Sequence, residues 1–310
     1  MSDTGKHDRT ATGAALVILA ALLYGAMNIS VKLSASHLSV WQTAMGRFLL
    51  GALVIPFLAR PLHLDLLGRE RRLLILRGLC ATAAFVLLIQ AIKTIPLSVA
   101  IVLFYLWPVF ACILSAWVAG EPTTGREWPF VIGAFFGSAL ILWPEEAGPG
   151  VQVGHLLALA SSFLAGMAII LIRRLGKTNN AFTIYFYFCL MGALFCLGPL
   201  LSRPASVLPA STAGWIGLLA VAVFAMSAQV IMNQGMKTLN ASRTGVYMMI
   251  EVLAASTFGV LWLSEPFGPK LVAGTILILG CGVALLFLPA PSQSGAGPDR
   301  TAGPVADPEA

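Results

Sequence analysis

Long apolar stretches alternate with short polar connections through almost the whole chain. Ten such stretches cover residues 12–34, 38–59, 73–92, 96–119, 127–144, 152–174, 180–201, 212–236, 242–264 and 268–288. Each has about 17–25 residues, the length with which a helix crosses a hydrocarbon core about 30 Å thick. The pattern predicts an all-α fold, a polytopic membrane protein with ten transmembrane helices and the lipid bilayer as its main partner.

The composition agrees with this pattern. Of the 310 residues, 58% are hydrophobic and 10% are charged, whereas soluble proteins carry about 25% charged residues. Residues 1–11 predict a polar N-terminal tail, and residues 289–310, rich in Pro, Gly, Ser and Ala, predict a disordered C-terminal tail. All five cysteines lie in apolar stretches without metal-ligand spacing, so we expect no metal and no cofactor.

Basic residues are distributed unevenly between the two sides of the predicted bundle. With the N-terminus inside, fourteen Lys and Arg fall in cytoplasmic segments, Arg77 among them, and four fall in outer segments: Lys32, Lys93, Arg203 and Lys270. Because cytoplasmic loops carry an excess of Lys and Arg, this distribution predicts an inner-membrane protein with both termini in the cytoplasm. The net charge of +6 is not gathered in one stripe, so we expect no nucleic-acid partner.

The chain contains an internal repeat. Residues 90–122 align without gaps to 234–266, and eight of 33 positions are identical at this offset of 144. The identities are Gln90/Gln234, Lys93/Lys237, Thr94/Thr238, Ser98/Ser242, Val102/Val246, Ala111/Ala255, Glu121/Glu265 and Pro122/Pro266. An earlier stretch repeats at an offset of 141, where Gly25 matches Gly166 and Gly51-Ala52-Leu53 matches Gly192-Ala193-Leu194.

The repeat divides the chain into a first five-helix half, residues 12–144, and a second, residues 152–288. Because each half has an odd number of helices, the second half must enter the membrane with the opposite orientation. The fold we predict is therefore two inverted five-helix repeats. Inverted repeats around a site near the middle of the bilayer are typical of secondary transporters.

Several short motifs complete the pattern. They are Arg47-Phe48, Arg77-Gly78, Gln90-Ala91-Ile92-Lys93-Thr94-Ile95-Pro96, Pro108, Gly120-Glu121-Pro122 and Ser264-Glu265-Pro266. Together with the duplication, they make the chain similar to the drug/metabolite transporter superfamily, and specifically to its EamA-type ten-helix members, over about residues 12–288. The resemblance implies a bundle in which helices 1–4 and 6–9 surround a central cavity and helices 5 and 10 support it from outside.

Two charged residues lie deep in predicted helices, Arg47 in 38–59 and Glu251 in 242–264. Burying either costs roughly 2.5–3.5 kcal/mol, so each needs a partner or a function. Glu251 shares a helical face with Tyr247, and the repeat places Trp107 opposite it. We expect Glu251 to line the cavity and to bind a cationic group or exchange a proton. For Arg47, a structural role and a carboxylate-binding role both stay open.

Other polar and aromatic side chains form stripes on the predicted helices. Tyr24 and Asn28 lie one turn apart on the first helix, and both cavity lining and helix–helix hydrogen bonding fit them. Asn233 and Gln234 end the predicted helix 212–236 and leave the same two roles open. Candidates in 96–119 are the aromatic residues Tyr105 and Trp107, beside Pro108, where a bend or hinge is expected because proline cannot complete the helical ladder.

These features predict a secondary transporter, an exporter of a small metabolite such as an amino acid or a related zwitterion, that works by alternating access. A larger aromatic or cationic metabolite or drug is the alternative substrate. An enzyme is not expected, because no His or Asp lies deep in a predicted helix to act as a base. A channel is a further alternative function. Protons are a candidate coupling ion, and the assembly can be a monomer or a homodimer.

Overall fold

A computed structural model of the chain describes residues 4–61, 65–118, 128–142, 151–202, 208–235, 244, 247–266 and 268–287. Its helices are α1 (Thr4–Leu33), α2 (Val40–Ala59), α3 (Arg71–Thr94), α4 (Leu97–Phe104), α5 (Trp107–Val118), α6 (Trp128–Leu142), α7 (Val153–Leu175), α8 (Ala181–Leu201), α9 (Thr212–Gly235), α11 (Ile250–Leu263) and α12 (Pro269–Phe287). Within the described ranges the elements are all helical, which confirms the predicted fold class.

Most of the described helices have the length that a bilayer requires. Seven spans are long and apolar enough to cross it, with α4 and α5 together forming one of them. Three shorter apolar helices, at Trp128–Ile141, Ile250–Leu263 and Pro269–Ala284, complete the set of ten. The chain is therefore a multi-pass membrane protein, as its pattern of apolar stretches predicts.

Two helix starts show how local sequence fixes these boundaries. Ser39 accepts a hydrogen bond from the Gln42 backbone N–H, and the Gln42 side chain accepts one from the Ser39 N–H, a capping box that starts α2. Asn180 caps α8 by accepting from the Thr183 N–H. Both caps satisfy backbone donors that would otherwise be unpaired at the first turn.

Three boundaries differ from the predicted ones. Helix α1 begins at Thr4, so it extends into the segment predicted as a polar tail. The predicted helix 96–119 is two helices, α4 and α5, separated by a turn at Tyr105 and Leu106. The predicted helix 242–264 is interrupted by a turn at Met249, before α11 begins. The predicted disordered tail, residues 289–310, lies outside the described residues.

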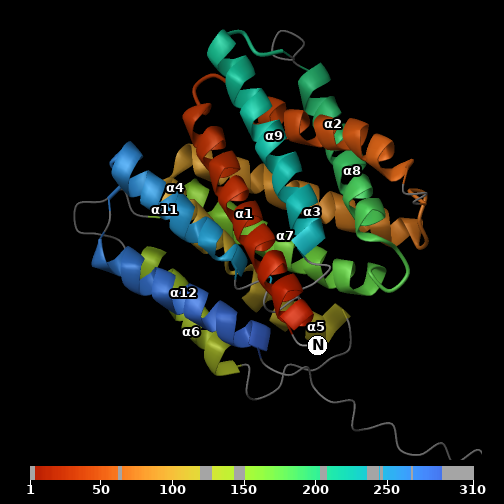
Figure 1. Cartoon of the computed structure of the whole chain (residues 1–310). Helices are drawn as coiled ribbons and strands as arrows, with labels where there is room; N and C mark the ends of the chain where they lie inside the picture. The colour runs from red at the N-terminus through yellow and green to blue at the C-terminus, as the bar shows by residue number, and fades with distance from the viewer. Residues whose placement is uncertain are drawn as a thin grey trace, which may run out of the picture.

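Helix contacts follow the duplication. Helix α1 packs on α9 and its counterpart α7 packs on α3, while α2 packs on α9 and its counterpart α8 packs on α3 (Figure 1). Each of the pairs α2–α8 and α6–α12 joins a helix to its own counterpart in the other half, and α4 packs on α11, the counterpart of α5. Helices α6 and α12 lie side by side at one edge of the bundle (Figure 1), as the family resemblance implies for the supporting helices.

The crossing of α2 and α8 shows the two-fold relation at atomic detail. A Cβ atom added at Gly51 would overlap Cys189, and one added at Gly192 would overlap Phe48. Gly51 and Gly192 are equivalent at the offset of 141, and so are Phe48 and Cys189. The same glycine-to-side-chain contact is thus made twice, once from each half, and it lets the two backbones approach closely.

A second pair of equivalent glycines makes the same kind of contact. A Cβ atom at Gly25 of α1 would lie 3.2 Å from Ala254 Cβ in α11. A Cβ atom at Gly166 of α7 would lie 3.0 Å from Phe110 Cβ in α5. Phe110 and Ala254 are equivalent at the offset of 144, as are the two turn residues Tyr105 and Met249. The helix breaks are therefore also part of the repeat.

We expect Gly192→Ala to destabilise the protein by about 1–3 kcal/mol, because the new methyl group would overpack against the Phe48 ring. Gly198→Ala on the same helix is the matched control, since a Cβ atom there has no neighbour within 4 Å. Thermal unfolding of both variants in detergent checks this. Equal midpoints for the two variants would contradict the close α2–α8 crossing.

Candidate functional site

The carboxylate of Glu251 lies in the middle of the bundle, where its side chain is 7% exposed. The Asn28 amide of α1 donates to Glu251 Oε1 at 2.7 Å. The Tyr105 hydroxyl, at the α4–α5 junction, donates to Glu251 Oε2 at 2.9 Å. Both carboxylate oxygens are thus held by side chains from the first half of the chain. The structure brings together three of the residues that the sequence singled out.

The two helix breaks position these groups. Pro108 has no N–H to donate to the Phe104 carbonyl, so α4 ends at Phe104 and the chain turns at Tyr105. From this turn, Tyr105 reaches the equivalent break in the other half, where its hydroxyl also lies 2.7 Å from the Met248 carbonyl oxygen. In a continuous helix, the Met248 carbonyl would accept a hydrogen bond from the backbone of its own helix. The break leaves this carbonyl available to the Tyr105 hydroxyl.

A second set of polar groups continues along α1 and α9. The Tyr24 hydroxyl, one turn before Asn28, donates to Gln229 Oε1 at 2.7 Å. Gln229 in turn donates to Asn233 Oδ1 at 3.1 Å. Tyr24 and Asn28 therefore make hydrogen bonds between helices, whereas the bond between Gln229 and Asn233 lies within α9. We call the set Tyr24, Asn28, Tyr105, Gln229 and Glu251 the polar centre.

Arg47 of α2 borders this centre without an acidic partner at ion-pair distance within the described residues. Its guanidinium carbon lies 4.0 Å from the centroid of the Phe85 ring, 5.6 Å from that of Phe188 and 5.9 Å from that of Tyr24. Its Nη1 atom donates to the Met27 sulfur at 3.3 Å, and its Nε atom, buried, has no hydrogen-bond partner in the described part of the chain.

These contacts explain how an arginine can stay buried here. Burial within a membrane costs roughly 2.5–3.5 kcal/mol, and cation–π contacts contribute about 0.5–2 kcal/mol each. The aromatic rings therefore offset much of the burial energy of Arg47. The unpaired Nε donor adds a penalty of about 1–3 kcal/mol, which a ligand acceptor would remove.

Arg77 is a residue whose place the sequence did not predict. It was expected among the cytoplasmic charges, but it lies within α3 and is 9% exposed. Its guanidinium carbon lies 5.0 Å from the Phe188 centroid, and its Nη1 atom donates to the Ile184 carbonyl at 3.3 Å. Helix α3 starts at Arg71, two residues before the predicted start, so Arg77 lies about 9 Å along it, too far to reach the surface easily.

The remaining candidates lie around the polar centre at different distances. Tyr247 is half-buried in helical backbone just before the turn at Met249, and Trp107 is half-buried at the start of α5. Gln234 is exposed near the end of α9 and faces away from Gln229, because residues five positions apart on a helix point in directions about 140° apart. Placing Gln234 in the site is therefore not supported by its position.

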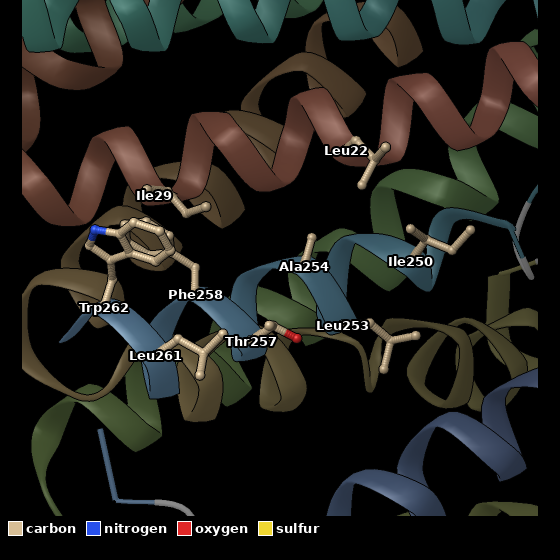
Figure 2. Close-up of a pocket in the computed structure, with 9 residues that line it drawn as sticks. All are labelled: Leu22, Ile29, Ile250, Leu253, Ala254, Thr257, Phe258, Leu261 and Trp262. Carbon is tan, nitrogen blue, oxygen red and sulfur yellow. The ribbon is translucent and has the colours of Figure 1, made fainter. Parts of the chain in front are cut away.

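A groove of about 430 Å³ opens at the side of the bundle between α1 and α11 (Figure 2). It is lined by Leu22 and Ile29 from α1 and by Leu253, Phe258 and Trp262 from α11. Leu253 and Trp262 are largely exposed, and Thr257 is its one polar lining residue. Such a surface suits hydrocarbon, so the polar centre is the better candidate for the site of a polar solute.

A second hollow, of about 520 Å³, lies where α1, α3 and α11 end, and includes Lys32, Gln152 and Glu265. Lys32 is one of the four basic residues of the predicted outer segments, and its Nζ atom donates to the carbonyl oxygens of Ile92 at 2.9 Å and Ile95 at 2.6 Å. Lys32 thus caps α3. We call this region the α1-end hollow.

Glu265 closes the α1-end hollow on its other side. Its carboxylate accepts hydrogen bonds from the backbone N–H groups of Leu97 and Ser98, and from the Ser98 hydroxyl at 2.7 Å. An acid at this position stabilises the start of α4, as capping and the helix dipole require. The Lys32 cap joins α1 to α3 within the first half, and the Glu265 cap joins the two halves at the hollow.

Comparison with known proteins agrees with this architecture. The model of the EamA-like transporter family matches residues 11–143 and again residues 152–288. The chain belongs to the EamA-like transporter family. Its place in the drug/metabolite transporter superfamily, which the motifs indicated, is thereby confirmed.

Individual relatives of this EamA-like transporter are also transporters. The "Pseudopaline exporter CntI" of Pseudomonas aeruginosa is 27% identical over 278 residues, covering 90% of this chain and 97% of that protein. The human "Solute carrier family 35 member G1" is 23% identical over 226 residues, covering 69% and 62% of the two chains. A solved crystal structure with 18% identity covers 90% of the chain with a TM-score of 0.64, which supports the fold.

These matches identify this EamA-like protein as a membrane transporter of small molecules. Family and relatives are named for transport rather than for catalysis, and the described residues hold no cluster of three or more potential metal ligands. The roles of the individual site residues stay predictions.

In this EamA-like transporter, we expect Tyr105→Phe to lower stability by about 1–3 kcal/mol, because Glu251 and the Met248 carbonyl would lose their shared donor. Tyr247→Phe, beside the equivalent break at Met249, is the control, since no described residue is a hydrogen-bond partner for its hydroxyl. Thermal unfolding compares the two. An equal effect of both changes would show that the Tyr105 hydroxyl does not hold the junction.

Proposed function

We propose that this transporter is a secondary carrier that exports a small zwitterionic metabolite, such as an amino acid, through the polar centre by alternating access. The observation that carries the proposal is the buried Glu251 carboxylate, held by two neutral donors and bordered by an arginine without an acidic partner in the described residues.

The Glu251 end of the polar centre is rich in acceptors. Asn28 uses its amide N–H to hold Glu251, which leaves Asn28 Oδ1 buried and without a partner in the described residues. An ammonium group has three donors and no acceptor. It would pair with the Glu251 carboxylate and satisfy the Asn28 oxygen at the same time.

The Arg47 end is rich in donors. Its unpaired Nε suits a carboxylate, which accepts two parallel hydrogen bonds from a guanidinium group. Tyr24, whose ring contacts Arg47, precedes Asn28 by one turn, about 6 Å along α1. A solute with an ammonium and a carboxylate at that separation would meet both ends.

The equivalent helix breaks at Tyr105 and Met249 supply a means of movement. Both breaks adjoin Glu251, so bending at either break would move the part of that half that contacts the substrate. Pro108 is the proposed hinge of the first half. Exchange of conformation between the two related halves would then open the polar centre to one side and close it to the other.

The same residues support the proposed direction of transport and its coupling. With both termini on the cytoplasmic side of the inner membrane, the α1-end hollow would face outward and serve as the exit for the substrate. Protons would serve as the coupling ion, because a proton and the substrate ammonium compete for the Glu251 carboxylate. Release of one would favour binding of the other.

We expect Glu251→Gln to reduce export of an amino-acid substrate from proteoliposomes by about tenfold or more and to remove its dependence on a proton gradient, because the variant carries no negative charge. Glu70→Gln is the control, since Glu70 is exposed and pairs with Arg174 at 3.7 Å.

Flux that saturates, and that shows counterflow, identifies a carrier. Linear flux would identify a channel. Unchanged affinity, rate and pH dependence in Glu251→Gln would remove Glu251 from the mechanism.

A further inference from the structure

We infer that Arg47 and Arg77 together form an anion-binding subsite and that the substrate therefore carries two carboxylates in addition to its amine. This inference rests on the proposed function, and it narrows the substrate from any amino acid to acidic ones. Arg77 enters the site here through its geometry, which its position near the start of α3 did not indicate.

The two guanidinium groups meet at one aromatic ring. Arg47 comes from α2 and Arg77 from α3, and their guanidinium carbons lie 5.6 Å and 5.0 Å from the centroid of Phe188 in α8. Their side chains thus converge from two helices on one face of a third. Helices α2, α3 and α8 contact one another pairwise, so this arrangement is part of the packed bundle.

Both arginines are more than nine-tenths buried, and both have an Nε donor without a partner in the described residues. The ion pair that the structure gives among the described residues does not involve either arginine, because it joins Arg174 and Glu70. The described bundle therefore holds two buried positive charges together and no carboxylate at ion-pair distance from either.

A substrate with two carboxylates satisfies the charges and hydrogen-bond donors of Arg47 and Arg77 better than a substrate with one carboxylate. A guanidinium group forms its strongest contacts as a fork that donates two parallel hydrogen bonds to one carboxylate. A monocarboxylate on Arg47 would leave Arg77 with its buried charge and its open donor. A dicarboxylate would pair with both, while its ammonium group meets Glu251 and Asn28 at the other end of the polar centre.

The substrate's charge also balances in this arrangement. The two substrate carboxylates face two guanidinium groups, and the substrate ammonium faces the Glu251 carboxylate. Together these six groups carry no net charge. Neutral loading matters in a membrane because an unbalanced charge is costly at this depth.

The test compares amino acids with their own amides in proteoliposomes that contain the full-length protein. Glutamate and glutamine have nearly the same shape, as do aspartate and asparagine, but each amide lacks one carboxylate. We expect the acid of each pair to be transported with a kcat/KM about tenfold or more above that of its amide.

The Arg77→Gln variant connects this preference to the subsite. It is expected to lower glutamate transport about tenfold and to leave glutamine transport within about twofold, so that the preference disappears. Arg174→Gln, which removes an exposed arginine, is the control and should keep the preference. If Arg77→Gln does not fold, Arg77→Lys replaces it in the test, because lysine keeps the positive charge but lacks the two parallel donors of a guanidinium group. The comparison of acid and amide in the wild-type protein needs no variant.

Three outcomes would overturn the inference. They are equal transport of acid and amide, an equal loss of both in Arg77→Gln, and transport of O-phosphoserine in preference to both dicarboxylates. Transport of glutamine that depends on Glu251, without preference for glutamate, would overturn the two-arginine subsite alone. Transport of none of the four amino acids would overturn the proposed function as well.

Discussion

The carboxylate of Glu251 is the group around which the centre of this transporter is organised. A charged side chain among apolar helices requires donors that come from the protein itself, because lipid offers none. Asn28 and Tyr105 provide them, and they come from two other membrane spans. Glu251 thus joins the two halves at the place where both broken helices meet. Any movement of one half against the other must change these hydrogen bonds.

The scaffold around this group is symmetrical, but the group itself is not. Gly51 and Gly192 make equivalent contacts at the α2–α8 crossing, and the breaks at Tyr105 and Met249 are equivalent too. The residue equivalent to Glu251 is Trp107. The repeated residues hold the halves together in related positions, while the unmatched acid gives the centre an acceptor end that the first half does not duplicate. A directional solute needs this kind of asymmetry in its site.

The helices could be predicted because a single constraint, the thickness of the bilayer, fixes their length. The inward-facing positions of Tyr24, Asn28 and Glu251 followed from their depth and spacing. Side-chain partners could not be predicted in the same way. Lys32 bonds to carbonyl groups of α3, and Arg77 turns into the bundle towards Phe188, because of helices distant in sequence. The break at Met249 has no proline to mark it, and only its equivalence to Tyr105 could have indicated it.

A structure of the protein in nanodiscs with its transported substrate bound, determined by electron cryo-microscopy, tests the central claim most directly. The account predicts substrate density in the polar centre, with the ammonium group at hydrogen-bond distance from Glu251 and Asn28 Oδ1 and carboxylate oxygens on Arg47. Density for the substrate in the groove between α1 and α11 (Figure 2), with the Glu251 hydrogen bonds to Asn28 and Tyr105 unchanged, would contradict it.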